Sequence, residues 1–374
     1  MVPRLVAFLR RQPRWILIAI GLLWVAALAA LDYVAPLELS FLTFYVAPVL
    51  FLVWFVGPAA GFLGAAVCAA FWVWEDVLSA HAHPMLKLQV TDWNLAIRAM
   101  FLALFVWVVA ELKRALERER HLAQERLEHD VQIAEEVQTR LFPRRDPEIR
   151  GLDCHGLCRP AHGVAGDYYD FLPLEPGRTG IAVGDVAGKG LPAALLMASL
   201  QGSLRSLVTL SKNGPASLAA DLNAQLHSLT ESNRFATFFW AVFDEQPRSL
   251  TWVNAGHNAP MLLRMSGAVE RLGPSGPPLG AIPRVAYRQA TTTLSPGDVL
   301  VIFTDGVTEA VDVSDQEFGE GRLERILRSN GTETAGALCD RIVSAVRVFE
   351  AGAPQNDDIT LVVARARGET SRAP

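Results

Sequence analysis

The sequence predicts an α+β protein: an antiparallel sheet system with helices outside, preceded by a membrane unit of four helices and a linker helix. Charges are scarce before Glu111, while Glu111–Pro143 is charged and has no internal Pro or Gly. From Gly151 on, short β-rich runs are separated by Gly, Pro and Asn turns. Strands and helices do not alternate strictly there, and several runs resemble hairpins. This favours antiparallel pairing over a doubly wound parallel sheet.

The apolar segment, residues 1–112, predicts four membrane spans at about 15–32, 39–56, 58–76 and 93–111. Each is long enough to cross the hydrocarbon layer. A buried hairpin of a soluble protein is the alternative. Basic residues flank the set on both sides: Arg4, Arg10, Arg11, Arg14, Lys113, Arg114, Arg118 and Arg120. This distribution predicts that both ends of the unit lie in the cytoplasm.

Residues 113–150 predict a linker helix, stopped by Pro143 and Pro147. A narrow apolar seam recurs at intervals near three, four or seven: Val109, Leu112, Leu116, Ala123, Leu127, Val131, Ala134 and Leu141. Such a seam is typical of a two-stranded coiled coil, so we expect a homodimer through this helix. A solvated single-helix spacer is the alternative.

Residues 151–368 are expected to form one domain, followed by a disordered tail at 369–374. The predicted strands lie around Leu157 and at Ile181–Val186, Thr237–Phe243, Leu250–Val253, Pro260–Leu263, Val299–Phe303 and Ile359–Val363. The predicted helices are Pro192–Leu207, Ala216–Leu229, Gly321–Leu327 and Thr334–Phe349.

Four segments of this domain place an aspartate at the edge of an apolar run: Gly166–Phe171, Gly184–Gly190, Phe303–Ala310 and Asn356–Val363. Each alone is typical of a turn. Carboxylates gathered at one end of a sheet repel each other unless cations neutralise them. Oxygen-only ligands suit Mg²⁺ or Mn²⁺, and two such ions can activate a water for attack on phosphorus. The sequence therefore predicts metal-dependent hydrolysis of a phosphate ester.

Other sites are disfavoured. AGKG is not a nucleotide-binding loop, because Val183 and Gly190 stand where that loop needs a glycine and a hydroxyl. Lys189 is expected at the mouth of the site or in solvent. Cys154 and Cys158 lack a second ligand pair for zinc. No basic groove indicates nucleic-acid binding.

From about Ala134 to Arg367 the sequence resembles the metal-dependent protein phosphatases of the phosphatase 2C (PPM) superfamily, in the bacterial branch of sporulation and stress-response regulators. The matching phrases occur in the family's order: AEEVQTRLFP, GDYYDFLPL, GDVAGKGLPAALLMASLQ, RFATFFWAVFD, VNAGHNAPMLL, PPLG, LSPGDVLVIFTDGVTEA and DDITLVV. The resemblance implies a β-sandwich flanked by helices, with two divalent cations, Mn²⁺ or Mg²⁺, at one end.

Carried over residue by residue, the resemblance implies five metal ligands: Asp167, Asp185, the carbonyl of Val186, Asp305 and Asp357. Asp185 would bridge the cations, and it would carry catalysis with Asp305 and Asp357. Three further residues would support the ligands: Asp170, His257 and Asp358. A turn histidine that only caps the hairpin is the alternative for His257. Ala187 stands where eukaryotic relatives often place a histidine, so their proposed general acid is missing.

The expected function is that of a membrane-anchored serine/threonine phosphatase in a bacterial inner membrane, with its domain in the cytoplasm. The resemblance implies a phosphorylated regulatory protein as substrate, of the STAS type that antagonises anti-sigma factors. A catalytically silent binding module with the same fold is the alternative.

Overall fold

A computed structural model describes residues 5–6, 8–9, 11–34, 42–82, 88–210, 214–229 and 234–368, with backbone only at 33–34, 42, 75–82, 88–94 and 210. The predicted disordered tail, 369–374, lies outside the described residues. Contacts divide the chain into two units, Met1–Leu127 and Glu128–Pro374, and each is described by itself.

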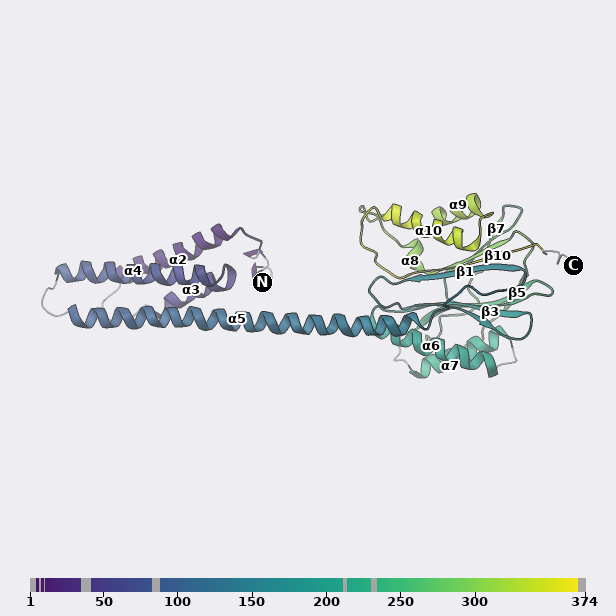
Figure 1. The fold of residues 1–374 in the computed structure, drawn as a ribbon, viewed down its shortest axis with the longest axis horizontal. Helices are drawn as coiled ribbons and strands as arrows, with labels where there is room; N and C mark the ends of the chain where they lie inside the picture. Colours follow the sequence, from purple (N-terminus) through teal and green to yellow (C-terminus); the bar gives the residue numbers. More distant parts are fainter. Residues whose placement is uncertain are drawn as a thin grey trace. The chain divides into compact units, whose positions relative to one another are not determined.

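The first unit is helical (Figure 1). Its helices are α2 (Arg14–Val34), α3 (Leu42–Phe55), α4 (Pro58–Ala82) and the first part of α5 (Leu88–Thr139). Buried apolar side chains from all four form one core, among them Val25, Val49, Cys68 and Val106. The four predicted spans thus fall on four helices, and their number as spans stays a prediction.

Among the described residues, length and composition alone make three helical segments candidates to cross a membrane: Arg14–Asp32, Leu95–Thr139 and Leu191–Thr209. The apolar parts of α3 and α4 are shorter, at Thr43–Phe55 and Pro58–Trp74. Leu191–Thr209 belongs to the second unit, where its helix buries one face against a sheet. Only the first two candidates therefore support a membrane unit.

The fourth predicted span and the linker form one uninterrupted helix, α5, which ends at Thr139, four residues before Pro143. The expected boundary at residue 112 is not marked by a break. Between residues 121 and 140, Gln138 is the only buried residue, with Val131 and Ala134 half-buried beside it. Most of the seam leucines face solvent in the single chain.

The second unit is a sandwich of two five-stranded antiparallel sheets, which confirms the predicted α+β class. The first sheet has the order β1-β10-β9-β6-β7 and the second β2-β3-β4-β5-β8. The strands are β1 (Leu152–Arg159), β2 (Asp167–Pro173), β3 (Arg178–Val186), β4 (Ala236–Asp244), β5 (Ser249–Ala255), β6 (Met261–Leu263), β7 (Val269–Arg271), β8 (Ala290–Thr293), β9 (Val299–Phe303) and β10 (Ile359–Ala366).

Helices cover the outer face of each sheet (Figure 1). They are α6 (Leu191–Leu210) and α7 (Pro215–Leu229) on the second sheet, and α8 (Asp305–Thr308), α9 (Glu320–Asn330) and α10 (Ala335–Glu350) on the first. The four predicted helices are confirmed to within a few residues. Strands β2, β7 and β8 and the single turn α8 were not predicted, because they are short or lack alternating polarity.

Strand β4 shows how the sequence builds the layers. Phe239 and Phe243 point between the sheets, while Phe238 and Trp240 point toward α6 and α7. Successive side chains of a strand alternate between faces, so a run apolar at every position is buried on both. One core therefore lies between the two sheets, and the other lies between the second sheet and helices α6 and α7.

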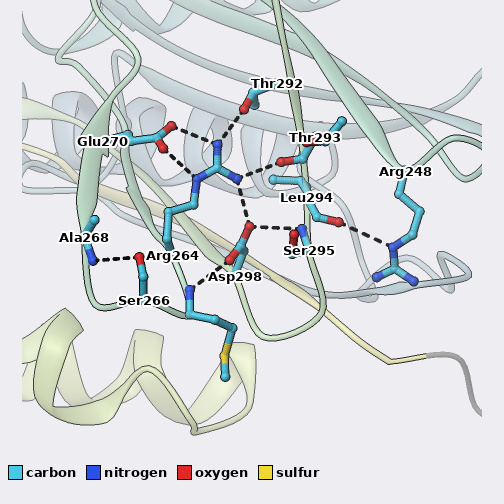
Figure 2. Close-up of polar contacts among 11 residues, drawn as sticks. Arg248, Arg264, Ser266, Ala268, Glu270, Thr292, Thr293, Leu294, Ser295 and Asp298 are labelled. Atoms are coloured by element: carbon cyan, nitrogen blue, oxygen red, sulfur yellow. Dashed lines mark hydrogen bonds and ion pairs between the residues drawn. The ribbon is translucent and has the colours of Figure 1, made fainter.

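Arg264 joins three segments at the edge of the sandwich (Figure 2). It forms ion pairs with Glu270 and with Asp298, both at 2.8 Å. It also donates to the Thr292 hydroxyl and the Thr293 carbonyl, each at 2.7 Å. Asp298 is 2% exposed, so its charge depends on these partners.

We predict that Arg264→Met destabilises the second unit by about 3 to 5 kcal/mol, because it leaves the buried Asp298 carboxylate without its cation. Thermal and urea unfolding followed by circular dichroism would measure the loss. The control is Arg328→Met, which breaks an exposed pair with Glu324 on α9 and should cost much less stability. Equal losses in the two variants would contradict the prediction.

Candidate active site at one end of the sandwich

The second sheet places two aspartates side by side. β2 and β3 pair with Asp167 directly opposite Asp185, on the face that looks between the sheets. Asp167 is 2% exposed. Burial, and then the charge of Asp185, raises the pKa of Asp167 well above its ordinary value. Burial, followed by the charges of Asp305 and Asp357, raises the pKa of Asp185 to about 7.

The first sheet brings Asp305 and Asp357 to the same end. Asp305 begins α8 just after β9, and Asp357 lies two residues before β10, the antiparallel neighbour of β9. Burial, and then the charge of Asp357, raises the pKa of Asp305. Gly306 allows the two turns to touch, because a Cβ there would lie 1.9 Å from the Asp358 carbonyl oxygen.

Hydrogen bonds join the two acid-bearing ends. The Thr304 hydroxyl, from the first sheet, donates to Asp167 Oδ2 at 2.7 Å. Asp358 accepts from the Gly166 amide at 2.7 Å and from the Ala161 amide at 2.8 Å. The Asp358 carboxylate thus binds the backbone that leads into β2, and it fixes Asp167 relative to β10.

Asp170 lies elsewhere. It stands three residues after Asp167 on the same strand, so its side chain emerges on the opposite face, toward α6. It is fully buried and forms an ion pair with Arg205 at 2.8 Å. The Tyr168 hydroxyl donates to it at 2.7 Å. The structure therefore brings Asp167, Asp185, Asp305, Asp357 and Asp358 together, and it does not bring Asp170 to them.

His257 is 3% exposed and lies near the candidate site. Burial lowers the pKa of His257 to about 4, so its imidazole is neutral. Its Nδ1 lies 2.9 Å from the hydroxyl of Thr237, which stands opposite Asp185 on the next strand. The Asn254 side chain accepts from the His257 amide at 2.7 Å. His257 thus holds Thr237 beside Asp185.

Two charged residues at the site carried no predicted role. The charge of Glu309 helps to raise the pKa of Asp185. Glu309 follows Asp305 by four residues on the helical turn, a spacing that could have revealed it. Lys189, whose place had been left open, lies at the mouth of the site and forms an ion pair with Asp357 at 2.8 Å.

Gln138 ties the end of α5 to the loop before Asp167. Its side-chain amide donates to the Ala165 carbonyl and accepts from the Ala165 amide, both at 2.7 Å. The helix packs closely here, since a Cβ at Gly163 would lie 3.0 Å from Val131. No local pattern in the sequence marked this contact, because it joins residues 27 positions apart.

The donor set fits hydrated divalent cations. Carboxylate and carbonyl oxygens are the ligands that Mg²⁺ and Mn²⁺ prefer, and Mg²⁺ keeps several waters and needs only one or two carboxylates. Within the described residues, no three Asp, Glu, His or Cys side chains form a ready-made metal cluster. A Cβ at Gly166 would lie 3.1 Å from the Val186 carbonyl oxygen, so glycine keeps that oxygen uncrowded.

Comparison with known proteins places the chain. The family model described as Stage II sporulation protein E matches residues 175–367. Phosphoserine phosphatase RsbU of Bacillus subtilis is 28% identical over 246 residues, which cover 65% of this chain and 72% of RsbU. Protein IcfG of Synechocystis is 26% identical over 287 residues, which cover 69% of this chain and 44% of IcfG.

Solved structures give the same fold. The SiaA-PP2C domain of Pseudomonas aeruginosa aligns with a TM-score of 0.59 at 22% identity, over 65% of this chain and 98% of that domain. The SpoIIE phosphatase structure from Bacillus subtilis aligns with a TM-score of 0.53 at 21% identity, over 59% of this chain and 63% of that one. Because the family model spans more than half of the residues, the chain belongs to the Stage II sporulation protein E (SpoIIE) family, and its second unit has the PP2C fold.

Proposed function

We propose that this chain is a membrane-anchored, metal-dependent protein phosphatase that hydrolyses phosphoserine or phosphothreonine on a regulatory protein. The observation that carries the proposal is the convergence of Asp167, Asp185, Asp305 and Asp357 from both sheets at one end of the sandwich. The names of the relatives RsbU and RsbP, both phosphoserine phosphatases of Bacillus subtilis, support it.

In this proposal Asp185, Asp305 and Asp357 would together hold divalent cations, because their charges act on one another at this end of the sandwich. Asp167 and the Val186 carbonyl would complete the ligand set. Asp167, which accepts a hydrogen bond from the Thr304 hydroxyl, would offer a carboxylate oxygen to a metal or a metal-bound water. The bound pair would supply an activated water and neutralise phosphate charge.

The neighbouring residues would position these ligands. Asp358 fixes the loop before Asp167 through its two backbone hydrogen bonds. Neutral His257 would hold Thr237 beside Asp185. Such partners orient ligands and tune metal affinity.

We further propose the organisation of the chain. Residues 1–112 anchor it in a bacterial inner membrane, residues 113–150 form the linker helix, and residues 151–368 form the phosphatase domain. The basic residues around the spans support a cytoplasmic N-terminus and phosphatase domain. The proposed substrate is a phosphorylated STAS-type protein, which the resemblance to stress-response and sporulation regulators supports.

We predict that Asp185→Asn lowers phosphate release from a phosphoserine STAS protein by at least about 100-fold at fixed Mn²⁺, because the bridging charge is lost. Release of inorganic phosphate by the full chain in detergent measures it. Asp340→Asn, an exposed acid on α10, is the matched control and should keep parental activity. Full activity in Asp185→Asn would exclude the two-metal arrangement.

Metal removal should destabilise the second unit, and more so at higher pH. The folded-state pKa of Asp185, about 7, lies above its ordinary value of 3.8. Between about pH 4 and pH 7 the metal-free folded chain therefore binds more protons than the unfolded chain, and its stability falls as pH rises. Bound cations replace these protons at neutral pH.

We accordingly expect a fixed Mn²⁺ concentration, about 100 times the dissociation constant at pH 8, to add about 2.7 kcal/mol at that pH, which raises the melting temperature by roughly 5 to 10 °C. Differential scanning calorimetry with Mn²⁺ and with EDTA, at pH 5 and pH 8, measures this. The gain should be larger at pH 8. A gain that is equal at both pH values would show that the acids do not bind the ions.

A dimer through α5 is also proposed. Leu116 and Leu127 are 38% and 59% exposed and lie on one face of the helix. Light scattering in detergent should find a dimer, and Leu116→Glu with Leu127→Glu should shift it toward monomer. Arg118→Glu on the opposite face is the control and should leave the dimer intact. A monomeric parent chain would refute the proposal.

A further inference from the structure

Lys189 lies in an exposed turn whose conformation depends on two glycines. It stands between Gly188 and Gly190, whose φ angles are 111° and 73°, a region that favours glycine. No atom lies within 4 Å of where a Cβ would stand on either glycine. The Lys189 side chain is 55% exposed. It can therefore move while its backbone stays attached to β3.

The Lys189 ammonium lies among the acids. Its Nζ is 2.8 Å from Asp357 Oδ2, and it donates to the Asn356 carbonyl at 2.6 Å. Its charge lowers the pKa of Asp305 and of Glu309 against the opposing effect of burial. In the part of the chain that the structure describes, no other Lys, Arg or His forms an ion pair with any of the four converging aspartates.

The pair with Asp357 is exchangeable. An ion pair between half-exposed groups contributes at most about 1 kcal/mol, and the lysine stem is long and flexible. With Asp357 committed to a divalent cation, the ammonium would meet a like charge and lose its partner. The nearest new anion at the mouth of the site would be the phosphoryl group of a substrate.

We propose that Lys189 binds the phosphoryl group of the substrate, after giving up Asp357. The inference rests on the proposed phosphatase function and adds a residue to it. Lysine is a point-charge binder of phosphate, and this one extends from the turn that directly follows Asp185. It supplies a cation where Ala187 offers no polar side chain.

This role predicts opposite effects on two affinities. Lys189 competes with the metal for Asp357 in the metal-free protein, and it assists phosphate binding once a cation occupies Asp357. Lys189→Met should bind Mn²⁺ about threefold more tightly, since no ammonium occupies Asp357. The same variant should bind inorganic phosphate about tenfold more weakly, since a charged hydrogen bond is lost. A lysine that only stabilised the turn would move both affinities together or neither.

The test is isothermal titration calorimetry on the full chain in detergent. Mn²⁺ is titrated into metal-free protein, and inorganic phosphate into Mg²⁺-saturated protein. Lys189→Arg, which keeps the charge, should retain most of the phosphate affinity. Arg347→Met on α10 is the control for loss of an exposed cation and should behave as the parent. Unchanged phosphate affinity in Lys189→Met, or a joint fall of both affinities, would overturn the proposal.

These measurements need no turnover. If the parent hydrolyses no phosphoprotein but the two affinities shift in opposite directions, the proposed function fails and the role of Lys189 in anion binding stands. If the parent is an active phosphatase and KM for the phosphoprotein is the same in Lys189→Met, the role of Lys189 fails and the function stands.

Discussion

The second unit gathers negatively charged aspartates at one end of the sandwich, where they are largely shielded from water. Asp167 and Asp185 face each other across β2 and β3, and Asp305 and Asp357 approach from the other sheet. Burial and mutual repulsion both disfavour the ionised forms, so the arrangement lacks its full stabilisation until protons or cations join it. The Thr304 hydroxyl and the Asp358 carboxylate hold the two sheets together at this end in spite of that repulsion.

Much of this arrangement could be predicted from the sequence. Helices α9 and α10 have strong 3.6-residue patterns, α6 and α7 have weaker ones, and β4 has an unbroken apolar run, and each was found near its observed bounds. Strands β7 and β8 have only three and four residues and are partly exposed. Nothing local distinguishes them from loops, and only pairing with β6 and β5 defines them.

The candidate site, too, could be predicted only in part. That acids end several strands is visible in the sequence, and their convergence follows once the strands share sheets. Asp170 shows the effect of not predicting β2 as a strand. Without that strand, its position three residues from Asp167 did not reveal that its side chain faces Arg205. The contacts of Thr304 and Gln138 depend on segments far apart in the chain, which no local pattern reports.

Gly306 offers no ligand, yet it governs where two acids stand. Any side chain there would collide with the backbone at Asp358 and push the α8 turn away from the β10 turn. A deep mutational scan would therefore rank this position among the least tolerant, although it performs no chemistry. Intolerance at such a glycine reports steric closeness of two backbones, and a ranking by tolerance alone would mistake it for a reacting group.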